Sequence, residues 1–255
     1  MTTLLEVKDV DKAYTLRGGD YAHPKKLMAL NHVSLELNAK ETLGLVGESG
    51  SGKSTLAKII LGIEKRTQGL INFDGQELKV WDKSVRARMQ IIFQNALASL
   101  NPRMRVEDML KEPFIVHGIT PPQGLQKRCA ELLASVHLDA NFMNKYAHEL
   151  SGGEAQRIAI ARAIALNPKL LICDEAVSSL DVIVRAQIMD LLLELQDQYD
   201  MAYLFISHDF GVIRHMSDRI SVMENGCIVE TGPSQDLFLT PKTAYTQRLI
   251  QASFL

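Results

Sequence analysis

The feature that most constrains the fold is a glycine-rich segment in the first quarter of the chain. Residues 47–55 read GESGSGKST, directly after the apolar run at residues 42–46. Glycines at this spacing let the backbone curl so that successive N–H groups point at one anion. A helix beginning near Lys53 would aim its positive dipole end at the same anion. The pattern predicts a phosphate-binding loop between a strand and a helix; the alternative is an ordinary Gly/Ser turn.

Two side chains give this segment a chemical task. Lys53 is long enough to reach terminal phosphates, and the Ser54 hydroxyl suits a ligand of the Mg²⁺ ion that neutralises them. The candidate nucleotide-binding residues here are Gly47, Glu48, Ser49, Gly50, Ser51, Gly52, Lys53, Ser54 and Thr55.

Composition limits the kinds of partner that the chain is expected to bind. The 255 residues carry a formal net charge of -2, so no basic excess points to a nucleic acid. Three widely spaced cysteines form no metal-ligand pattern and suggest a reducing compartment. An acidic residue at position 6 comes too early for a signal peptide, and no apolar run approaches ~18 residues. Any membrane connection is expected through a partner.

The order of predicted elements indicates an α/β fold with a helical insert. Strands are expected at residues 4–7, 33–37, 42–46, 70–73, 89–93, 169–173, 202–206, 220–223 and 227–230. Helices are expected at residues 125–137, 154–166, 182–198, 234–239 and 244–252. Asp74-Gly75 and Asn225-Gly226 read as hairpin turns. Residues 17–26 read as a polar loop, and residues 106–148 as a helical block interrupted by Pro113 and by Pro121-Pro122.

A phosphate loop needs a partner strand that ends in carboxylates, and residues 170–175 (LLICDE) fit. Asp174 would emerge at the carboxyl end of a buried strand, where α/β sheets bind ligands, and could hold Mg²⁺. Glu175 could deprotonate an attacking water. The alternative is an acidic pair that caps a helix after a core strand.

A third segment, residues 150–157 (LSGGEAQR), precedes a predicted helix. Ser151 followed by two glycines would make an anion-binding helix N-terminus with a hydroxyl donor. The alternative is a plain N-cap in which Ser151 and Glu154 form a capping box.

Together these motifs resemble those of an ATP-binding cassette (ABC) ATPase over essentially the whole chain. GESGSGKST resembles the Walker A motif, LSGGE the ABC signature, and LLICDE the Walker B motif with its catalytic glutamate. Gln94 lies where the Q-loop glutamine of the family would lie. Residues 179–181 resemble the D-loop, and residues 207–209 the H-loop with His208 as its switch histidine.

The resemblance implies a role for each matching residue. Catalytic roles fall to Glu175, His208 and Gln94. Mg²⁺ ligands would be Ser54, Gln94 and Asp174. Residues serving the nucleotide of a partner cassette would be Ser151, Gly152, Gly153, Glu154 and Asp181. Tyr14 would stack on adenine, unless it is an ordinary strand-end tyrosine; His208, taken alone, also reads as a capping or packing residue.

A finer resemblance points to importers of peptides or nickel. Residues 98–103 (ASLNPR) and the tail at residues 240–247 (TPKTAYTQ) are similar to segments of that subfamily. Ala176 stands where many cassettes have proline, which resembles the nickel and antimicrobial-peptide cassettes more than the oligopeptide ones. The chain lacks the cysteine-rich extension of many oligopeptide cassettes, so no iron–sulfur cluster is expected.

The resemblance implies a RecA-like P-loop NTPase core with an antiparallel β subdomain and a helical subdomain. Residues 1–255 would form one domain, with the core at 1–94 and 155–255 and the helical part at about 95–154. The expected partners are transmembrane permease subunits, a second cassette (a copy or a paralogue) and, indirectly, a solute-binding protein. The chain would hydrolyse ATP at the cytoplasmic face of the inner membrane. The alternatives are a non-transport cassette of DNA repair or translation, and a nucleotide-binding regulator without turnover.

Overall fold

The computed structural model describes residues 2–15 and 26–253. The chain forms two compact units, one of Met1–Trp81 with Leu204–Leu255 and one of Asp82–Tyr203. Apart from Lys26, the predicted polar loop at residues 17–26 lies outside the described residues. The boundaries at residues 94 and 154 that the sequence suggests for a core and a helical part remain a prediction.

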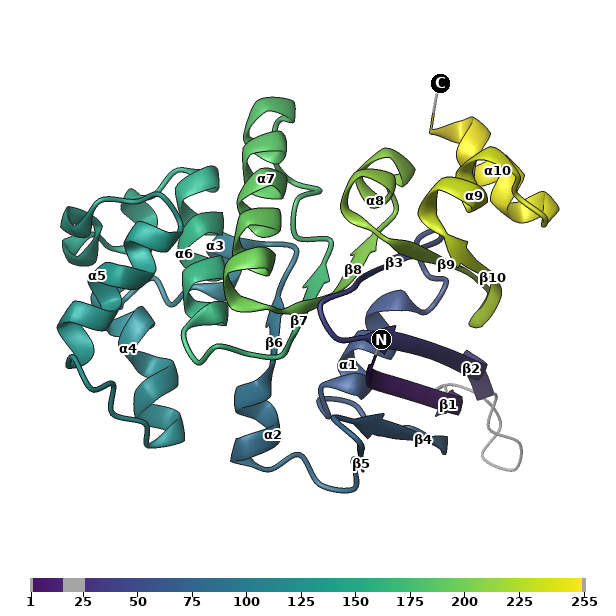
Figure 1. Ribbon diagram of the computed structural model, residues 1–255, viewed down its shortest axis with the longest axis horizontal. Helices are drawn as coiled ribbons and strands as arrows, with labels where there is room; N and C mark the ends of the chain where they lie inside the picture. Colours follow the sequence, from purple (N-terminus) through teal and green to yellow (C-terminus); the bar gives the residue numbers. More distant parts are fainter. Residues whose placement is uncertain (1, 16–25, 254–255) are drawn as a thin grey trace. The chain divides into compact units, whose positions relative to one another are not determined.

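The first unit contains a four-stranded antiparallel sheet in the order β2-β1-β4-β5 (Figure 1). Its strands are β1 (Thr3–Thr15), β2 (Lys26–Asn38), β4 (Gln68–Phe73) and β5 (Gln76–Glu77). Asp74 and Gly75 join β4 to β5 with φ of 53° and 77°. Two positive φ values in a two-residue hairpin are the pattern that Asp-Gly favours, so the predicted turn is confirmed.

Strand β1 is much longer than the strand predicted at residues 4–7. The pairing of β1 with β2 shifts register between Val7 and Val10, and Asp9 there has a φ of 46°. Bulges of this kind let a strand continue through residues that break a simple alternation. Asp11 is buried and accepts a 2.6 Å hydrogen bond from the His32 N–H, so a polar residue is accommodated inside the sheet.

The same unit holds a second group of strands, in the order β10-β9-β3-β8. Strand β3 (Thr42–Val46) runs parallel to β9 (Arg219–Glu224), and β10 (Cys227–Pro233) pairs antiparallel with β9. Strand β8 (Ala202–Ser207) belongs to this unit from Leu204 onward. Asn225 and Gly226 form the predicted hairpin between β9 and β10, with φ of 48° and 82°.

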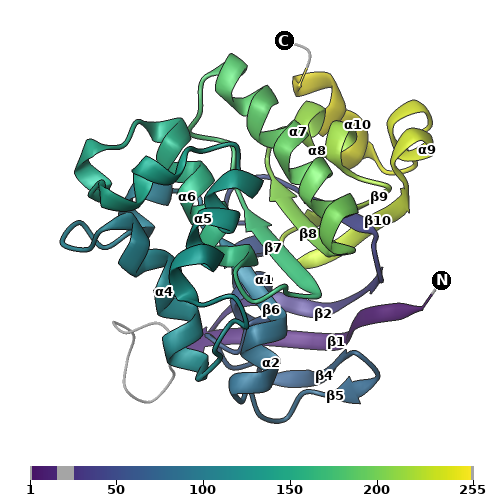
Figure 2. The same cartoon turned by 60° about the vertical axis from the view of Figure 1, so that its left-hand side comes forward.

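The described part of the first unit contains four helices. They are α1 (Lys53–Ile60), α8 (Phe210–Met216), α9 (Ser234–Leu239) and α10 (Ala244–Ala252). Helix α1 begins at Lys53, as the phosphate-loop reading predicts. Helix α8 is not among the predicted elements, because seven residues that include Gly211 are too few to establish a helical period. Figures 1 and 2 both show α9 beside α10.

The second unit contains the parallel pair β6 (Met89–Ile92) and β7 (Leu170–Asp174) and most of the helices. The α-helices are α2 (Lys83–Arg88), α3 (Ala96–Ser99), α4 (Val106–His117), α5 (Leu125–Ser135), α6 (Gly152–Ile164) and α7 (Val182–Tyr199). The 3₁₀ turns are η1 (Ala140–Asn144) and η2 (Ala147–Glu149). Helices α4, α5 and α6 pack on one another (Figure 2).

The sequence predicts that Pro113 interrupts the helical block, but α4 continues through Pro113 to His117, so this prediction is wrong. A proline inside a helix costs one backbone hydrogen bond, about 3 kcal/mol. Val106, Met109, Leu110 and Phe114 of α4 are buried. Burying such side chains contributes roughly 1.5–3 kcal/mol each, which outweighs the missing hydrogen bond.

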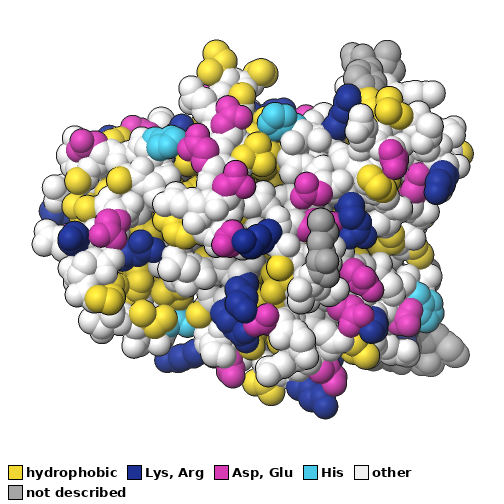
Figure 3. Space-filling model, viewed as in Figure 1, with side chains coloured by type: hydrophobic (Ala, Val, Ile, Leu, Met, Phe, Trp, Pro, Cys, Tyr) yellow, Lys and Arg dark blue, Asp and Glu magenta, His cyan; other side chains and the backbone are white. Residues whose placement is uncertain are grey.

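Among the helices of residues 2–15 and 26–253, none combines the length and the apolar character needed to cross a membrane. On the face drawn in Figure 3, Lys and Arg side chains are interspersed with Asp and Glu, in keeping with a net charge near zero.

Candidate functional site

The phosphate loop of the first unit connects β3 to α1. A Cβ atom on Gly47 would lie 2.1 Å from the Met223 carbonyl oxygen, so only glycine fits there. Gly52, at the start of α1, has a φ of 111°, and its Cβ would lie 2.6 Å from the Ala29 carbonyl oxygen. The N-cap residue of α1 is Gly52, which has no side chain with which to cap the helix. The helix begins directly at the loop, and a helix N-terminus offers backbone N–H groups to an anion.

The Lys53 side chain stabilises the loop by hydrogen bonds to its backbone carbonyl groups. Its ammonium donates to the Gly47 carbonyl at 2.7 Å and the Glu48 carbonyl at 2.8 Å, and it lies 3.3 Å from the Ser51 hydroxyl. The Lys53 residue is only 5% exposed. A cation held in the curve of the loop adds positive charge where a phosphate group would lie.

Tyr245 also contacts the loop, a role that the sequence did not predict. The Glu48 N–H donates to the Tyr245 hydroxyl at 3.1 Å, and Tyr245 is 6% exposed. Burial raises the pKa of Tyr245, so its hydroxyl stays protonated at neutral pH. Helix α10, which carries Tyr245, is therefore part of the support of the phosphate loop. The tail motif that contains Tyr245 was visible in the sequence, but its contact with a loop almost two hundred residues away was not.

The start of helix α10 is in turn hydrogen-bonded to β10. Glu230 of β10 accepts hydrogen bonds from the Lys242 N–H at 2.8 Å and the Thr243 N–H at 3.1 Å. The Thr243 hydroxyl donates to the same carboxylate at 3.1 Å, and Thr243 also caps α10. One carboxylate thus orders the turn from which α10 begins.

Two more predicted residues belong to the first unit. His208 follows β8 and is exposed. The next residue, Asp209, caps α8 by accepting from the N–H groups of Gly211 and Val212. The position of His208 is therefore set between the end of a strand and a capped helix. Tyr14 lies near the end of β1, where the Lys12 ammonium is 4.7 Å from the centre of its ring.

The second unit brings Gln94 and the two carboxylates to one edge of its parallel strands. Ile92 pairs with Cys173, so β6 and β7 end side by side, and Gln94 and Asp174 follow at that edge. The Ser179 hydroxyl donates to the Gln94 carbonyl at 3.3 Å, which ties the two connections together. Asp174 and Glu175 are half-buried and Gln94 is exposed.

Glu175 has a left-handed backbone, with a φ of 52°. Such a conformation is uncommon for a residue other than glycine and costs roughly 1–3 kcal/mol. The Glu175 carbonyl accepts from the Ser178 hydroxyl at 2.9 Å and from the Ser178 N–H at 3.2 Å, which stabilises the turn. The chain therefore changes direction sharply at the carboxylate that was predicted to act as the base.

Ser151 forms the capping box that the sequence left open as an alternative. Its hydroxyl accepts from the Glu154 N–H at 3.3 Å, and the Glu154 carboxylate accepts from the Ser151 N–H at 2.7 Å. The latter hydrogen bond lowers the pKa of Glu154. A hydroxyl that accepts in a cap still has its own proton to donate, so capping and anion binding are compatible.

The start of α6 packs against the start of α7. A Cβ on Gly153 would lie 2.9 Å from Val184 Cγ1, so any larger residue would force the Val184 side chain to move. Asp181 caps α7 through the N–H groups of Ile183 and Val184. The segment of Ser151 and the segment of Asp181 are thereby brought together.

In the described ranges, 2–15 and 26–253, no group of three or more His, Cys, Asp or Glu side chains could hold a metal ion by itself. Magnesium typically takes one or two protein ligands, with phosphate oxygens and waters completing its shell. Ser54 in the first turn of α1 and Asp174 at the end of β7 are oxygen donors of that kind. Each of these two donors, taken in its own unit, has the oxygen chemistry that a Mg²⁺ ion favours.

Comparison with known proteins gives consistent matches over most of the chain. Residues 30–178 match the family model described as "ABC transporter". The chain is 43% identical to the oligopeptide transport ATP-binding protein AppF of Bacillus subtilis, over 98% of this chain and 78% of that protein. It is 39% identical to the dipeptide transport ATP-binding protein DppF of Haemophilus influenzae, over 99% of this chain and 78% of that protein.

Among solved structures, the chain is similar to the ATP-binding cassette MJ0796 in a dimeric post-hydrolysis state bound to ADP and Pi. The TM-score is 0.78 and the identity 29%, over 91% of this chain and 99% of that chain.

Proposed function

Since this chain belongs to the ABC transporter family and is an ATP-binding ATPase of that family, we propose that it powers the import of peptides through a separate membrane permease. The observation that carries the proposal is the phosphate loop closed around the buried Lys53 ammonium. The cargo follows from the relatives AppF and DppF, which are named for oligopeptide and dipeptide transport. Neither of these names supports the nickel alternative.

The loop residues would bind the β- and γ-phosphates of ATP. Lys53 would exchange its carbonyl partners for phosphate oxygens, so that the acceptor as well as the donor would be charged. Ser54 and Asp174, with Gln94, would hold the Mg²⁺ ion. When bound, that ion offsets the charge on the phosphates.

Hydrolysis would depend on Glu175 and His208. We assign Glu175 to accept a proton from the attacking water, and its fixed turn would keep the carboxylate in one place while it does so. His208 would donate a hydrogen bond to the γ-phosphate as negative charge moves to it. Tyr14 would stack on the adenine ring.

The site would be completed by a second cassette, either a copy of this chain or a paralogue. Ser151, Gly152, Gly153 and Glu154, with Asp181, would then face the nucleotide of the partner. The helix N-terminus at Ser151 offers N–H groups and a hydroxyl for that contact. The dimeric MJ0796 cassette is the precedent for such pairing. Closing two cassettes on ATP and reopening them after hydrolysis would drive the permease, at the cytoplasmic face of the membrane.

Uptake by cells tests the proposal. Cells in which this chain is replaced by Glu175→Gln should bind ATP through it but lose uptake of a labelled tripeptide. Glu194→Gln, an exposed acid-to-amide change on α7, is the matched control and should keep uptake. Labelled nickel uptake should be equal in all three strains. The assignment of Glu175 to peptide import would be overturned if the Glu175→Gln strain still took up the tripeptide. The peptide cargo would be overturned if that strain lost nickel uptake and kept tripeptide uptake.

A further inference from the structure

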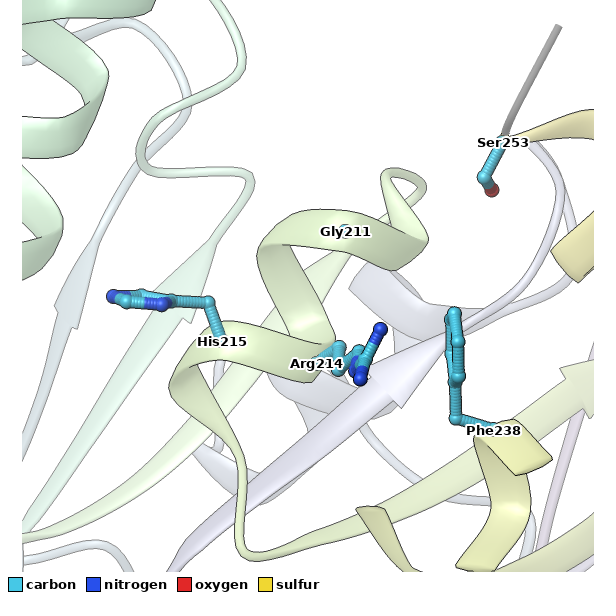
Figure 4. A pocket seen from close by; sticks show the side chains of 5 residues that line it. All are labelled: Gly211, Arg214, His215, Phe238 and Ser253. Carbon is cyan, nitrogen blue, oxygen red and sulfur yellow. The ribbon is translucent and has the colours of Figure 1, made fainter. Parts of the chain in front are cut away.

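A cavity of about 480 Å³ lies in the first unit, and none of its described lining residues is assigned to nucleotide chemistry (Figure 4). Its lining residues come from three helices near the end of the chain: Gly211, Arg214, His215, Phe238 and Ser253. Small-molecule sites generally have volumes of roughly 300–1,000 Å³, so the cavity is large enough for a metabolite-sized ligand.

Arg214 is the chemical centre of this cavity. Its guanidinium carbon lies 3.9 Å from the centre of the Phe238 ring, and Figure 4 shows the two side chains facing one another. Phe238 in turn lies against Phe210, whose side chain is buried, with ring centres 6.2 Å apart. The ring is thus anchored to the core and holds the guanidinium in place. Such preorganisation reduces the entropy that a ligand contact would cost.

Arg214 has no ion-pair partner in the part of the chain that the structure describes, because no carboxylate there lies within ion-pair distance of its guanidinium. His215, on the same helix, points to the opposite side of α8 in Figure 4, so the cation that faces Phe238 is Arg214. An arginine stacked on a ring keeps the N–H groups at its edge available to a planar anion.

The remaining walls leave room beside the guanidinium. Gly211 carries no side chain, which keeps the first turn of α8 open. The Ser253 hydroxyl donates to the Leu249 carbonyl at 2.9 Å, so its oxygen can still accept a hydrogen bond. An apolar ring edge, a cation and an acceptor therefore line the same space.

We propose that this cavity binds a small molecule in which a carboxylate or phosphate group is joined to an apolar or aromatic group. The anion would pair with the edge of the Arg214 guanidinium, and the apolar group would cover Phe238. Both groups are needed, because an exposed ion pair alone contributes little.

The elements that form the cavity also hold parts of the nucleotide site. Helix α8 begins at the cap formed by Asp209, next to His208, and Gly211 is one of the two residues whose N–H groups make that cap. Helix α10 is capped at its C-terminus by Ser253 and carries Tyr245, which holds the phosphate loop. A ligand between α8 and the end of α10 would restrain both, so it should change nucleotide affinity. This coupling rests on the proposed function; the binding does not.

Binding is tested by NMR on the full-length chain, with the phosphate loop filled by the Mg²⁺ complex of a non-hydrolysable ATP analogue. The filled loop keeps the probes out of the nucleotide site. Phenylacetate and phenyl phosphate are the probes, and phenylacetamide is the uncharged control. Saturable shifts of the Gly211 and Ser253 amide signals are expected with at least one anion. Whichever anion binds more tightly identifies the head group.

Variants locate the binding. Arg214→Gln should weaken it at least about tenfold, the loss expected for one charge-assisted pair. Arg248→Gln is the matched control, because Arg248 also lies over a ring, that of Tyr245, but is paired with Glu224 at 3.8 Å. Equal binding of phenylacetamide, unchanged affinity in Arg214→Gln, or no saturable shift with either anion would overturn the proposal.

The coupling has its own measurement. Calorimetry of the ATP analogue with and without a saturating anionic probe should give different affinities, and by reciprocity the analogue should change probe affinity by the same factor. If the probe binds and the two nucleotide affinities are equal, the coupling is wrong and the site stands. ATP hydrolysis does not enter any of these readouts, so a failure of the proposed function would be distinguishable.

Discussion

At the scale of single residues, the phosphate loop is held by two side chains with opposite roles. The Lys53 ammonium donates hydrogen bonds to carbonyl groups of the loop, while the Tyr245 hydroxyl accepts one from the Glu48 N–H. The first side chain supplies charge to a ligand. The second fixes the curvature of the backbone that would contact that ligand.

Lys53→Ala should weaken MgATP binding roughly 10- to 100-fold, because a hydrogen bond to a charged group is worth about 1.5–3 kcal/mol. Calorimetric titration with ATP measures the change. Lys58→Ala, at an exposed position on the same helix, is the control and should bind like the parent. Parent-like affinity in Lys53→Ala would contradict the role given to Lys53.

Tyr245→Phe should raise the KM for ATP severalfold and leave kcat within about twofold. The reason is that the ring stays and only the acceptor for the Glu48 N–H is lost, at a cost of about 1 kcal/mol. Tyr203→Phe is the matched control, since the buried Tyr203 hydroxyl donates to the Leu192 carbonyl at 2.8 Å, in the other unit. A general loss of stability would affect both variants alike. If the KM for ATP were unchanged in Tyr245→Phe, the contact from α10 would not position the loop.

At the scale of elements, local chemistry explains what the sequence could predict. Asp74-Gly75 and Asn225-Gly226 require positive φ values that few residues tolerate, so both hairpins were predictable. The α/β class and the cassette-type fold are confirmed by the similarity to MJ0796. Helix α8 and the extension of β1 were missed because a seven-residue helix and a bulged strand carry no clear period.

In the candidate site, too, some features could be predicted from the sequence and others could not. The phosphate loop could be predicted as the connection from β3 to α1, because the backbone positions of Gly47 and Gly52 require glycine. Its role in binding a nucleotide stays a prediction. The Ser179 contact with the Gln94 carbonyl and the Tyr245 contact with Glu48 could not, because both join residues far apart in sequence. Neither periodicity nor composition carries information about such pairs.

Glu230→Gln should loosen the connection between β10 and α10. Burial alone would raise the pKa of Glu230, but its hydrogen bonds from Thr246, Lys242 and Thr243 lower it below the usual 4.5. A carboxylate with a lowered pKa stabilises the fold above its unfolded-state pKa, and this contribution is lost as pH falls through the folded value.

The parent should therefore be about 1 kcal/mol more stable than Glu230→Gln at neutral pH. The difference should shrink below about pH 4.5, as denaturant unfolding at several pH values would show. Glu36→Gln, at an exposed position of β2, should show no such pH-dependent difference. A stability gap that persists in acid would mean that the ionised carboxylate is not what fastens α10.

At the scale of the whole molecule, the assigned roles are shared between two units. The phosphate loop, Tyr14 and His208 belong to one unit, and Gln94, Glu175 and Ser151 belong to the other. In the proposed function Ser151 serves the nucleotide of a partner cassette. One chain by itself would then carry the parts of a site without completing it, and turnover would require a second cassette.

The most direct test of this account is the ATPase rate per chain, measured as the concentration of the isolated chain is raised. If two cassettes complete each site, the rate per chain is low and rises severalfold with concentration or on addition of the partner cassette and permease. Ser151→Ala should reduce that rise, because it removes the hydroxyl offered to the partner's nucleotide. A high rate per chain that is independent of concentration, and equal in Ser151→Ala, would show that one chain forms a complete site and would contradict the account.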